Sequence, residues 1–325
     1  MKSSDIKVWV LFGGPSRERE VSIKSGNGIA KALKSKGYVV EAFDVQPGPA
    51  IHSLNWAQPP DIVFLGLHGT WGEDGVIQGF LESLKIPYVG SDVQASVLSF
   101  HKGLSKMLMS AAGIPVPFSY SIKGLDSFQN MENSGNLSRE FFSNDWYLKP
   151  AREGSTIGIE RFRGTTFKGS SARSEFYRLL NLVLEFDQDV LIEEWIEGPE
   201  LTVPVLNGKA LPVVEIRPDS KFYDYSSKYT VGKTQYFCPA PLSMDDTLLC
   251  QSLAEKTFRC LSCLDYGRVD IMLGKNGPKV LEMNTLPGMT ETSLVPKSAM
   301  AAGLDYATFL DVLLKSSMER QRASQ

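Results

Sequence analysis

Cysteine and histidine are scarce in this sequence, which contains four of the first and three of the second among 325 residues. Such small numbers argue against a disulfide framework and against a zinc site built from several cysteines. The one close pair, Cys260 and Cys263, stands in AEKTFRCLSCL, which reads as a helix. We therefore interpret this pair as part of a packed helix face, with zinc binding or redox chemistry as the alternative.

Excess positive charge and long apolar runs are also missing. The formal net charge is -3 and the lysines are scattered, which excludes an extended basic surface for nucleic acid. No stretch reaches the length of a membrane span, and the apolar run in MKSSDIKVWVLFGG is too short for a secretory signal. We expect a cytoplasmic protein that binds small soluble partners, with no nucleic acid or membrane among them.

The length exceeds what one hydrophobic core comfortably supports, so several domains are expected. KVWVLF, YVVEAFDV and DIVFLGL read as strands, and a helical pattern ending near Gly37 follows the first of them. This alternation predicts an α/β fold with a parallel, doubly wound sheet that binds ligands at the carboxyl ends of its strands. Residues 95–111 read as one helix. We place the domains at residues 1–97, 98–197 and 198–325.

The loop LFGGPSREREVS follows the first strand and raises a question about its ligand. Two glycines after a strand are typical of a phosphate-binding turn, but four charged residues come next, at positions 17–20. The loop is not G-x-G-x-x-G, and no acidic ribose partner follows, so the pattern does not support an NAD-dependent dehydrogenase. The residues alone leave both a phosphate and a cation open as the ligand.

Two strand-like runs joined by a turn, GRVDIMLGKNGPKVLEMNT, carry the most specific local pattern. Arg268 and Asp270 are two residues apart, as are Glu282 and Asn284, so each pair shares one face of its strand. Two carboxylates and an amide are oxygen ligands of the kind that magnesium prefers. A solvated hairpin face is the alternative.

The register of this hairpin decides between the two interpretations. A two-residue loop at 276–277 would place Asp270 and Glu282 on opposite faces. Pro278 has no N–H with which to close such a tight turn. We therefore predict a loop of odd length, such as residues 275–277 with Gly277 left-handed, which brings the two carboxylates opposite each other.

Three further segments suit a nucleotide and its cover. KPAREGSTIGI can lay backbone N–H groups and hydroxyls along a triphosphate, although it is not a Walker motif and a plain hairpin turn is the alternative. LIEEWIEGPE offers acidic acceptors for an adenine amine and ribose hydroxyls, or simply surface acids. KFYDYSSKYTVGKTQYF is rich in aromatics and suits a lid over residues 221–237 that excludes water; ordinary loop packing is the alternative.

These motifs together resemble the D-alanine–D-alanine ligase family of the ATP-grasp superfamily. The resemblance runs nearly from end to end, through GGPSREREVS, LHGTWGEDG, KPAREGSTIGI, LIEEWIEGPE, FYDYSSKYTVGKTQYFCPA, GRVDIML and LEMNTLPGMTETSLVP. It implies a Rossmann-like pre-ATP-grasp domain followed by a two-part ATP-grasp fold. It also implies ATP-dependent ligation of two D-alanines through a D-alanyl phosphate for peptidoglycan precursors, ATP with two Mg²⁺ ions or Mn²⁺ instead, and a homodimer.

The resemblance also implies roles for individual residues. Glu18 would receive the ammonium of the first D-alanine, which answers the question of the first loop in favour of a cation. The other matched positions are substrate-binding Ser22, His68, Ser293 and Leu294; catalytic Ser155, Tyr229, Arg268 and Gly288, the last through its N–H; metal-binding Asp270, Glu282 and Asn284; and ATP-binding Lys102, Lys149, Glu193, Glu194, Ile196, Glu200 and Lys228.

Tyr229 bears on the second substrate. Family members that accept D-lactate depart from the tyrosine pattern at this position, so Tyr229 favours an amine nucleophile and a dipeptide product. The nearest alternative is another ATP-grasp ligase with a different acceptor, such as a D-alanine–D-lactate ligase. A non-catalytic ATP-binding protein would be expected to have lost metal or oxyanion residues, and all of them are present in this sequence.

Overall fold

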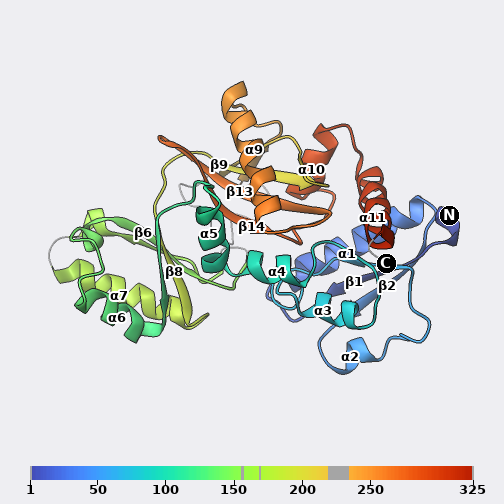
Figure 1. The fold of residues 1–325 in the computed structure, drawn as a ribbon, viewed down its shortest axis with the longest axis horizontal. Helices are drawn as coiled ribbons and strands as arrows, with labels where there is room; N and C mark the ends of the chain where they lie inside the picture. The colour runs from blue at the N-terminus through green and yellow to red at the C-terminus, as the bar shows by residue number, and fades with distance from the viewer. Residues whose placement is uncertain (1, 155–156, 168–169, 219–233, 324–325) are drawn as a thin grey trace.

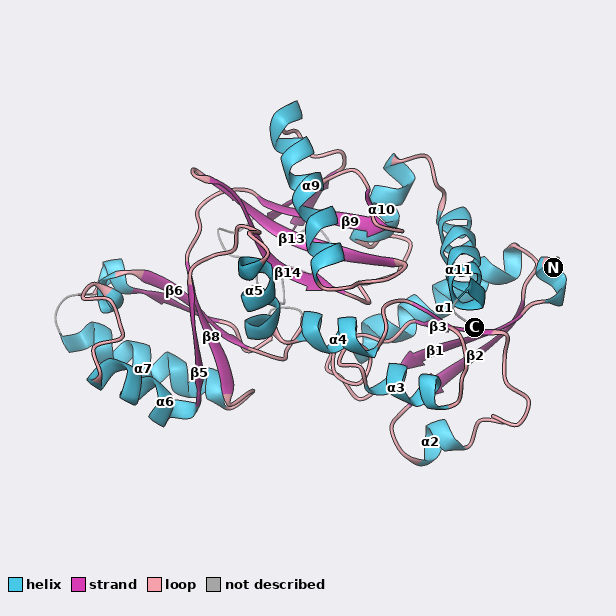
Figure 2. Ribbon diagram, in the orientation of Figure 1, coloured by secondary structure: helices cyan, strands magenta, loops and turns pink. Residues whose placement is uncertain are grey.

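The computed structural model describes residues 2–154, 157–167, 170–218 and 234–323, which form three β-sheets with helices packed against them (Figures 1 and 2). Tyr229, Lys228 and Ser155 lie outside the described residues, as does most of the expected lid. None of the described helices combines the length and the apolar character needed to cross a membrane.

The first sheet is parallel throughout, with strand order β2-β1-β3-β4. The central strand β1 is almost entirely buried, as its apolar sequence KVWVLF predicts. The doubly wound N-terminal sheet expected from the alternating pattern is thus confirmed. Its elements are β1 (Lys7–Gly13), α1 (Arg19–Ser35), β2 (Val39–Val45), α2 (Pro49–His52), β3 (Ile62–Leu65), α3 (Val76–Ser83) and β4 (Tyr88–Val89).

The second sheet is antiparallel, with strand order β5-β8-β6-β7. It packs on α6 and α7 around a core rich in aromatic residues (Figure 2, left). Its elements are β5 (Ser119–Lys123), α6 (Gly124–Asn133), β6 (Asp145–Pro150), β7 (Glu160–Arg163), α7 (Ser170–Leu184) and β8 (Asp189–Glu194).

The third sheet is also antiparallel, with order β12-β11-β9-β13-β14 and β10 paired to β9. Helix α9 packs on it, and so do α4 and α5, which precede the second sheet in the chain. Its elements are α4 (Val93–Phe100), α5 (Lys102–Ala111), β9 (Glu200–Leu206), β10 (Lys209–Ala210), β11 (Val214–Pro218), β12 (Thr234–Phe237), α9 (Met244–Cys260), β13 (Tyr266–Gly274), β14 (Gly277–Asn284) and α10 (Leu294–Ala301).

The last helix, α11 (Tyr306–Ala323), returns to the first sheet, where it lies beside α1 (Figure 1). Its apolar residues join the core of the N-terminal sheet. Buried Asp265, directly before β13, holds α11 in this position. Its carboxylate accepts hydrogen bonds from the Arg320 guanidinium at 2.9 Å, from the Ser317 hydroxyl at 2.7 Å and from the Gly90 N–H at 2.8 Å. The two ends of the chain therefore share one core, and the division at 97 and 197 stays a prediction.

The segment 95–111 is not one helix, as its apolar spacing predicts, but two. The backbone of His101 is extended, with φ -87° and ψ 97°, and separates α4 from α5. Its imidazole accepts a hydrogen bond from the Leu104 N–H and so begins α5. A side chain that satisfies an unpaired N–H of the first turn stabilises a new helix start, and the apolar pattern carries no sign of that break.

Asp270 does pair with Glu282, as predicted, but by another route. The predicted loop of odd length is wrong, because the loop has two residues, between the paired Gly274 and Gly277. The register instead shifts after Asp270, through an irregularity in the facing strand. This bulge supplies the extra residue that we placed in the loop. Gly277 has φ +95° as expected, so the carboxylates of β13 and β14 share a face.

The cysteine pair behaves as packing residues. Cys263 is buried in the core of the third sheet, and Cys260, the last residue of α9, is partly exposed against it. Neither forms a disulfide, and the described residues contain no cluster of three or more histidine, cysteine and acidic side chains arranged for a metal.

Candidate active site

A cavity of about 490 Å³ opens between the loops of the first sheet and the face of the third. That volume is typical of sites for small ligands. Loops at the carboxyl ends of β1 and β3 line one side, and β13, β14 and the following loop line the other. Eleven of the expected site residues line the cavity: Glu18, His68, Lys102, Glu200, Arg268, Asp270, Glu282, Asn284, Gly288, Ser293 and Leu294.

Glu18 is buried at the wall of this cavity and directly precedes α1. Its carboxylate makes no capping hydrogen bond to the helix. Gly154 of the KPAREG loop approaches it closely, since a Cβ at this glycine would lie 2.7 Å from Glu18 Oε2. The Gly69 backbone, with φ +66°, lies against the same oxygen. Glycines from two loops thus leave room for the carboxylate.

Ser22, which we expected to bind substrate, is not among the residues that line the cavity. Its hydroxyl is fully buried, accepts a hydrogen bond from the Gly13 N–H at 2.8 Å and donates one to the Gly66 C=O at 2.7 Å. Ser22 therefore joins the ends of β1 and β3 behind the cavity, whereas Val21, which the sequence reasoning missed, lines it.

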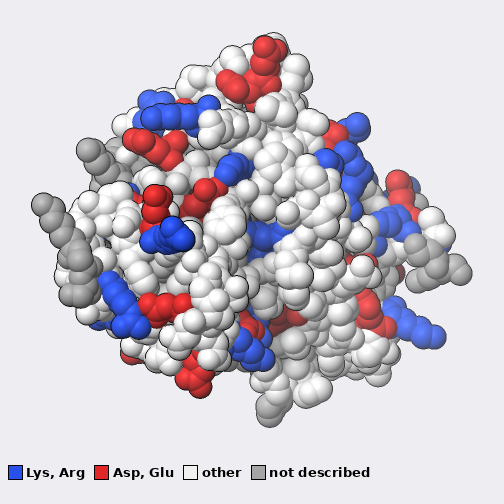
Figure 3. Space-filling model, turned by 60° about the vertical axis from the view of Figure 1, so that its left-hand side comes forward, with Lys and Arg blue, Asp and Glu red and all other residues white. Residues whose placement is uncertain are grey.

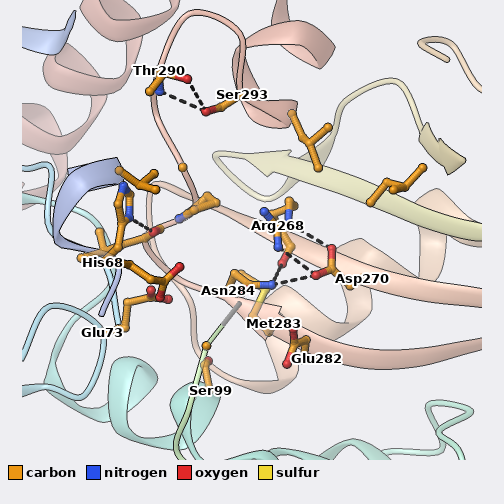
Figure 4. Close-up of a pocket in the computed structure, with 18 of the residues that line it drawn as sticks. His68, Glu73, Ser99, Arg268, Asp270, Glu282, Met283, Asn284, Thr290 and Ser293 are labelled. Atoms are coloured by element: carbon orange, nitrogen blue, oxygen red, sulfur yellow. Dashed lines mark hydrogen bonds and ion pairs between the residues drawn. The ribbon is translucent and has the colours of Figure 1, made fainter. Parts of the chain in front are cut away.

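His68 ties the loop after β14 to the first sheet (Figure 4). Its Nδ1 lies 2.9 Å from the Leu286 C=O, and its Nε2 lies 3.0 Å from the Ser25 hydroxyl. Since that hydroxyl also accepts the Met289 N–H, we assign the proton to Nδ1, with Nε2 accepting from Ser25. Burial lowers the pKa of His68, although the Glu18 charge opposes this, so the ring is neutral. His68 thereby holds the loop that contains Gly288.

Arg268, Asp270 and Asn284 form a connected group on β13 and β14 (Figure 4). The guanidinium donates two hydrogen bonds to the Asp270 carboxylate, at 3.0 and 2.8 Å, and the Asn284 amide approaches the same carboxylate at 3.1 Å. Thr202 of β9 donates to Asp270 at 2.7 Å from behind. These contacts fix the carboxylate, which accepts from all three neighbours.

Glu282 faces the same cavity and pairs with Lys102, whose Nζ lies 3.2 Å from its Oε2. Lys102 also donates to the Glu153 C=O in the KPAREG loop. Each acidic side chain of the expected metal site is thus paired with a cation in the structure, as expected of carboxylates that bind positive charge.

The third wall comes from the loop before α10. Ser293 directly precedes this helix, and its hydroxyl lies 2.7 Å from the Thr290 hydroxyl and 3.1 Å from the Thr290 N–H (Figure 4). The first-turn N–H groups of α10 are directed out of the helix at this end, which suits the binding of an anion. Lys297 of α10 lines the same part of the cavity.

Four other residues expected to bind ATP are not among those that line this cavity: Lys149 on β6, Glu193 and Glu194 on β8, and Ile196 after β8. Glu193 is buried between the ammonium groups of Lys149 and Lys106. Burial alone would raise the pKa of Glu193, but the two cations outweigh it and hold that pKa below its ordinary value. Glu194 pairs with Lys279 of β14, which links the second sheet to the third. Ile196 follows β8 at the same sheet end; a Cβ at Gly274 would approach it to 2.9 Å.

Sequence reasoning missed Glu73 and Lys106. Glu73, in LHGTWGEDG, lines the cavity and accepts a hydrogen bond from the Gly69 N–H at 2.8 Å. Burial, reinforced by the Glu18 charge, raises the pKa of Glu73 to about 8. The position of Glu73 in a loop after a strand could have identified it as a residue near the ligand. For Lys106 the signal was its spacing of four from Lys102, which places both on one face of α5.

Basic and acidic side chains are interspersed over the face of the molecule drawn in Figure 3. The lysines and arginines on this face do not gather into one surface.

The chain is similar to known proteins over almost its whole length. A family model described as D-ala D-ala ligase C-terminus matches residues 108–315, and one described as D-ala D-ala ligase N-terminus matches residues 47–91. A D-alanine–D-alanine ligase of Methylacidiphilum infernorum is 42% identical over 315 residues, which cover 97% of this chain and 96% of that protein.

Solved structures agree with this similarity. The crystal structure of a D-alanine–D-alanine ligase from Bacillus anthracis complexed with ATP is 31% identical, covers 98% of this chain and 99% of its own, and superposes with a TM-score of 0.81. A D-Ala:D-Ser ligase from Enterococcus faecalis is 28% identical, covers 96% of this chain and 99% of its own, and has a TM-score of 0.81.

Proposed function

The chain belongs to the D-alanine–D-alanine ligase family, and from this premise we propose how its residues carry out the ATP-dependent joining of two D-alanines for peptidoglycan synthesis. In this reaction the carboxylate of the first D-alanine attacks the γ-phosphate of ATP and releases ADP. The amine of the second D-alanine then attacks the D-alanyl phosphate, expels phosphate and loses a proton.

The observation that carries the assignment of roles is the single cavity onto which Glu18, Arg268 and Ser293 open from separate parts of the chain. Glu18 receives the ammonium of the first D-alanine, which places the carboxylate of that substrate toward β13 and β14. The α10 N-terminus after Ser293, with the Leu294 N–H, receives the carboxylate of the second. The two substrates thus meet beside Arg268.

Arg268 and the Gly288 N–H stabilise the negative charge that develops when the amine attacks. Both line the cavity, and His68 holds the loop that presents Gly288. Removing one such donor commonly costs about 10²- to 10³-fold in rate. Ser155, Lys228 and Tyr229, which lie outside the described residues, keep the roles that the family resemblance implies.

The donor set of Asp270, Glu282 and Asn284 fits Mg²⁺, because it supplies two facing carboxylates and an amide within one cavity. We propose that these three residues hold two ions, with Mn²⁺ as a substitute. When bound, Mg²⁺ neutralises charge on the phosphate oxygens. Lys102, which pairs with Glu282 in the structure, contacts a phosphate of ATP.

For the nucleotide, we propose that Lys149 contacts a phosphate, Glu193 accepts a hydrogen bond from the adenine amine and Glu200 binds the ribose. Glu194 and Ile196 contact the adenine through their backbone. The linked arrangement of β8 and β14 through Glu194 and Lys279 supports a nucleotide held between the second and third sheets.

We also propose a homodimer in the cytoplasm, where ATP is available. Exposed apolar side chains on the adjacent helices α3 and α4, Val76 and Val97, support a partner at this surface. Analytical ultracentrifugation tests the dimer: a monomer at micromolar concentration would contradict it.

The reaction is tested by mass spectrometry of the products formed from ATP, Mg²⁺ and D-alanine, with D-lactate, D-serine and L-alanine offered in parallel. We expect D-alanyl-D-alanine, with one phosphate released per bond. A mixed product with D-serine or D-lactate in preference to the dipeptide would identify a different acceptor, as in the E. faecalis relative. Phosphate release without a new bond between two substrates would contradict ligation of D-alanine to any of the acceptors offered.

A further inference from the structure

Lys106 of α5 is a buried lysine with no role in the reaction proposed above. Its side chain is 5% exposed, and its Nζ lies 2.6 Å from Glu193 Oε2. The same ammonium donates a hydrogen bond of 2.9 Å to the Leu281 C=O of β14. An ammonium group so far from water persists only when it is paired and hydrogen-bonded.

Its partner Glu193 is enclosed still more completely, with a side chain 1% exposed. One carboxylate oxygen, Oε1, contacts Lys149, and the other, Oε2, contacts Lys106. Oε2 has no regular hydrogen bond within the described part of the chain, so the ion pair with Lys106 is the contact that compensates it.

The two lysines differ in what they are free to do. Lys149 lies at the end of β6, where its side chain is 12% exposed. Lys106 is anchored from two directions, by the second sheet through Glu193 and by β14 through Leu281. Only Lys149 can therefore move to a ligand without breaking contacts to two different sheets.

We infer that Lys106 is the permanent counter-charge of Glu193, which allows Lys149 to leave that carboxylate for a phosphate when ATP binds. The inference rests on the proposed roles of Glu193 toward the adenine amine and of Lys149 toward a phosphate. Both roles require the contact between these two residues to be exchanged for contacts with ATP. After the exchange, Lys106 still neutralises Oε2, and Oε1 accepts from the amine. Lys106 is thus a positioning residue that acts through Glu193.

Lys106→Met tests this directly, because it removes the charge and keeps an unbranched side chain. After Lys149 moves to the phosphate, Glu193 has no cation in contact, and a buried carboxylate in that state takes up a proton. The titratable groups facing Glu193 are Lys106 from α5 and Lys149 and Tyr147 from β6, while Glu282 of β14 acts on Lys106.

Losing one partner of a buried charge pair weakens ATP binding on the order of 100-fold. Because ATP binding to the variant takes up a proton, its affinity falls further as the pH rises, by up to about tenfold per pH unit. The wild type, whose Glu193 stays charged in both states, lacks this dependence.

The experiment is isothermal titration calorimetry of the full chain with excess Mg²⁺ and no D-alanine, using ATP and purine riboside 5′-triphosphate, which lacks the amine. Lys106→Arg retains the charge and should retain flat pH behaviour. The double variant Lys106→Met with Glu193→Gln should recover most of the ATP affinity and lose the pH dependence, because it removes both charges of the buried Lys106–Glu193 pair. Lys256→Met, which removes an exposed lysine that also donates to a carbonyl, is the matched control and should bind ATP as the wild type does.

A Lys106→Met variant with unchanged ATP affinity and no pH dependence overturns the inference, and so does a double variant as weak as the single one. If Lys106→Met does not fold, the ATP affinity of the double variant decides alone: binding on the order of 100-fold weaker than in the wild type overturns the inference. Wild-type protein that binds ATP and the analogue equally would remove the adenine role of Glu193 and the exchange with it. Absence of dipeptide synthesis, with these binding results intact, would overturn the ligase reaction and leave the role of Lys106 standing.

Discussion

Replacing Glu18 by glutamine removes one negative charge from the cavity and leaves its volume unchanged. The carboxylate is buried, and Gly154 and Gly69 leave room for it at the cavity wall. A hydrogen bond to a charged group contributes about 1.5 to 3 kcal/mol, which corresponds to a rise of roughly 10- to 150-fold in KM for the first D-alanine. The melting temperature should change little, because the side chain does not cap α1.

The assay is the initial rate of ADP formation over a wide range of D-alanine concentration, fitted to two substrate sites. Glu20→Gln is the matched control: it makes the same change two residues later, on an exposed side chain in the first turn of α1. We expect the control to match the wild type. An equal rise in KM for both variants, or an unchanged first-site KM for Glu18→Gln, would refute a direct contact with the substrate ammonium.

Three other substitutions test separate parts of the structure. Arg268→Met should lower kcat by about 10²- to 10³-fold while ATP binding, measured by calorimetry, stays within the wild-type range; weaker ATP binding with an unchanged kcat would contradict the oxyanion role. Asp265→Asn should cost about 3 kcal/mol of unfolding free energy in urea, because it leaves the Arg320 guanidinium without its buried partner, and a stability equal to wild type would show that this pair does not hold α11 in place. The pKa of Glu73 in the folded protein is raised to about 8, so the folded protein binds this proton more tightly than the unfolded chain does. The free energy of unfolding therefore falls as the pH rises from the unfolded-state pKa to the folded-state pKa. The fall is at most about 1.4 kcal/mol per pH unit. Glu73→Gln should therefore gain stability relative to wild type from about pH 5 to pH 8 in urea melts, and parallel curves would show that the carboxyl is not held neutral.

The sequence determined the local arrangement of the site wherever that arrangement depends on a single helix, strand or strand end. The apolar run of β1 and the alternation of strands and helices determine a parallel sheet, and the strand ends then place Glu18 and His68 at one edge. The spacing of two places Arg268 and Asp270 on one face of a strand. These inferences need only the period of an element and the direction of its side chains.

Where two elements meet, only the tertiary structure decided the outcome. The bulge opposite Asp270 and the helix start at His101 depend on contacts that no periodicity encodes. The return of α11 to the first core depends on which apolar faces find each other across two hundred residues or more. The pairing of Lys106 with Glu193 is of the same kind. A lysine on a helix face is expected to be exposed to solvent, but here the second sheet covers Lys106 and supplies a buried carboxylate as its counter-charge.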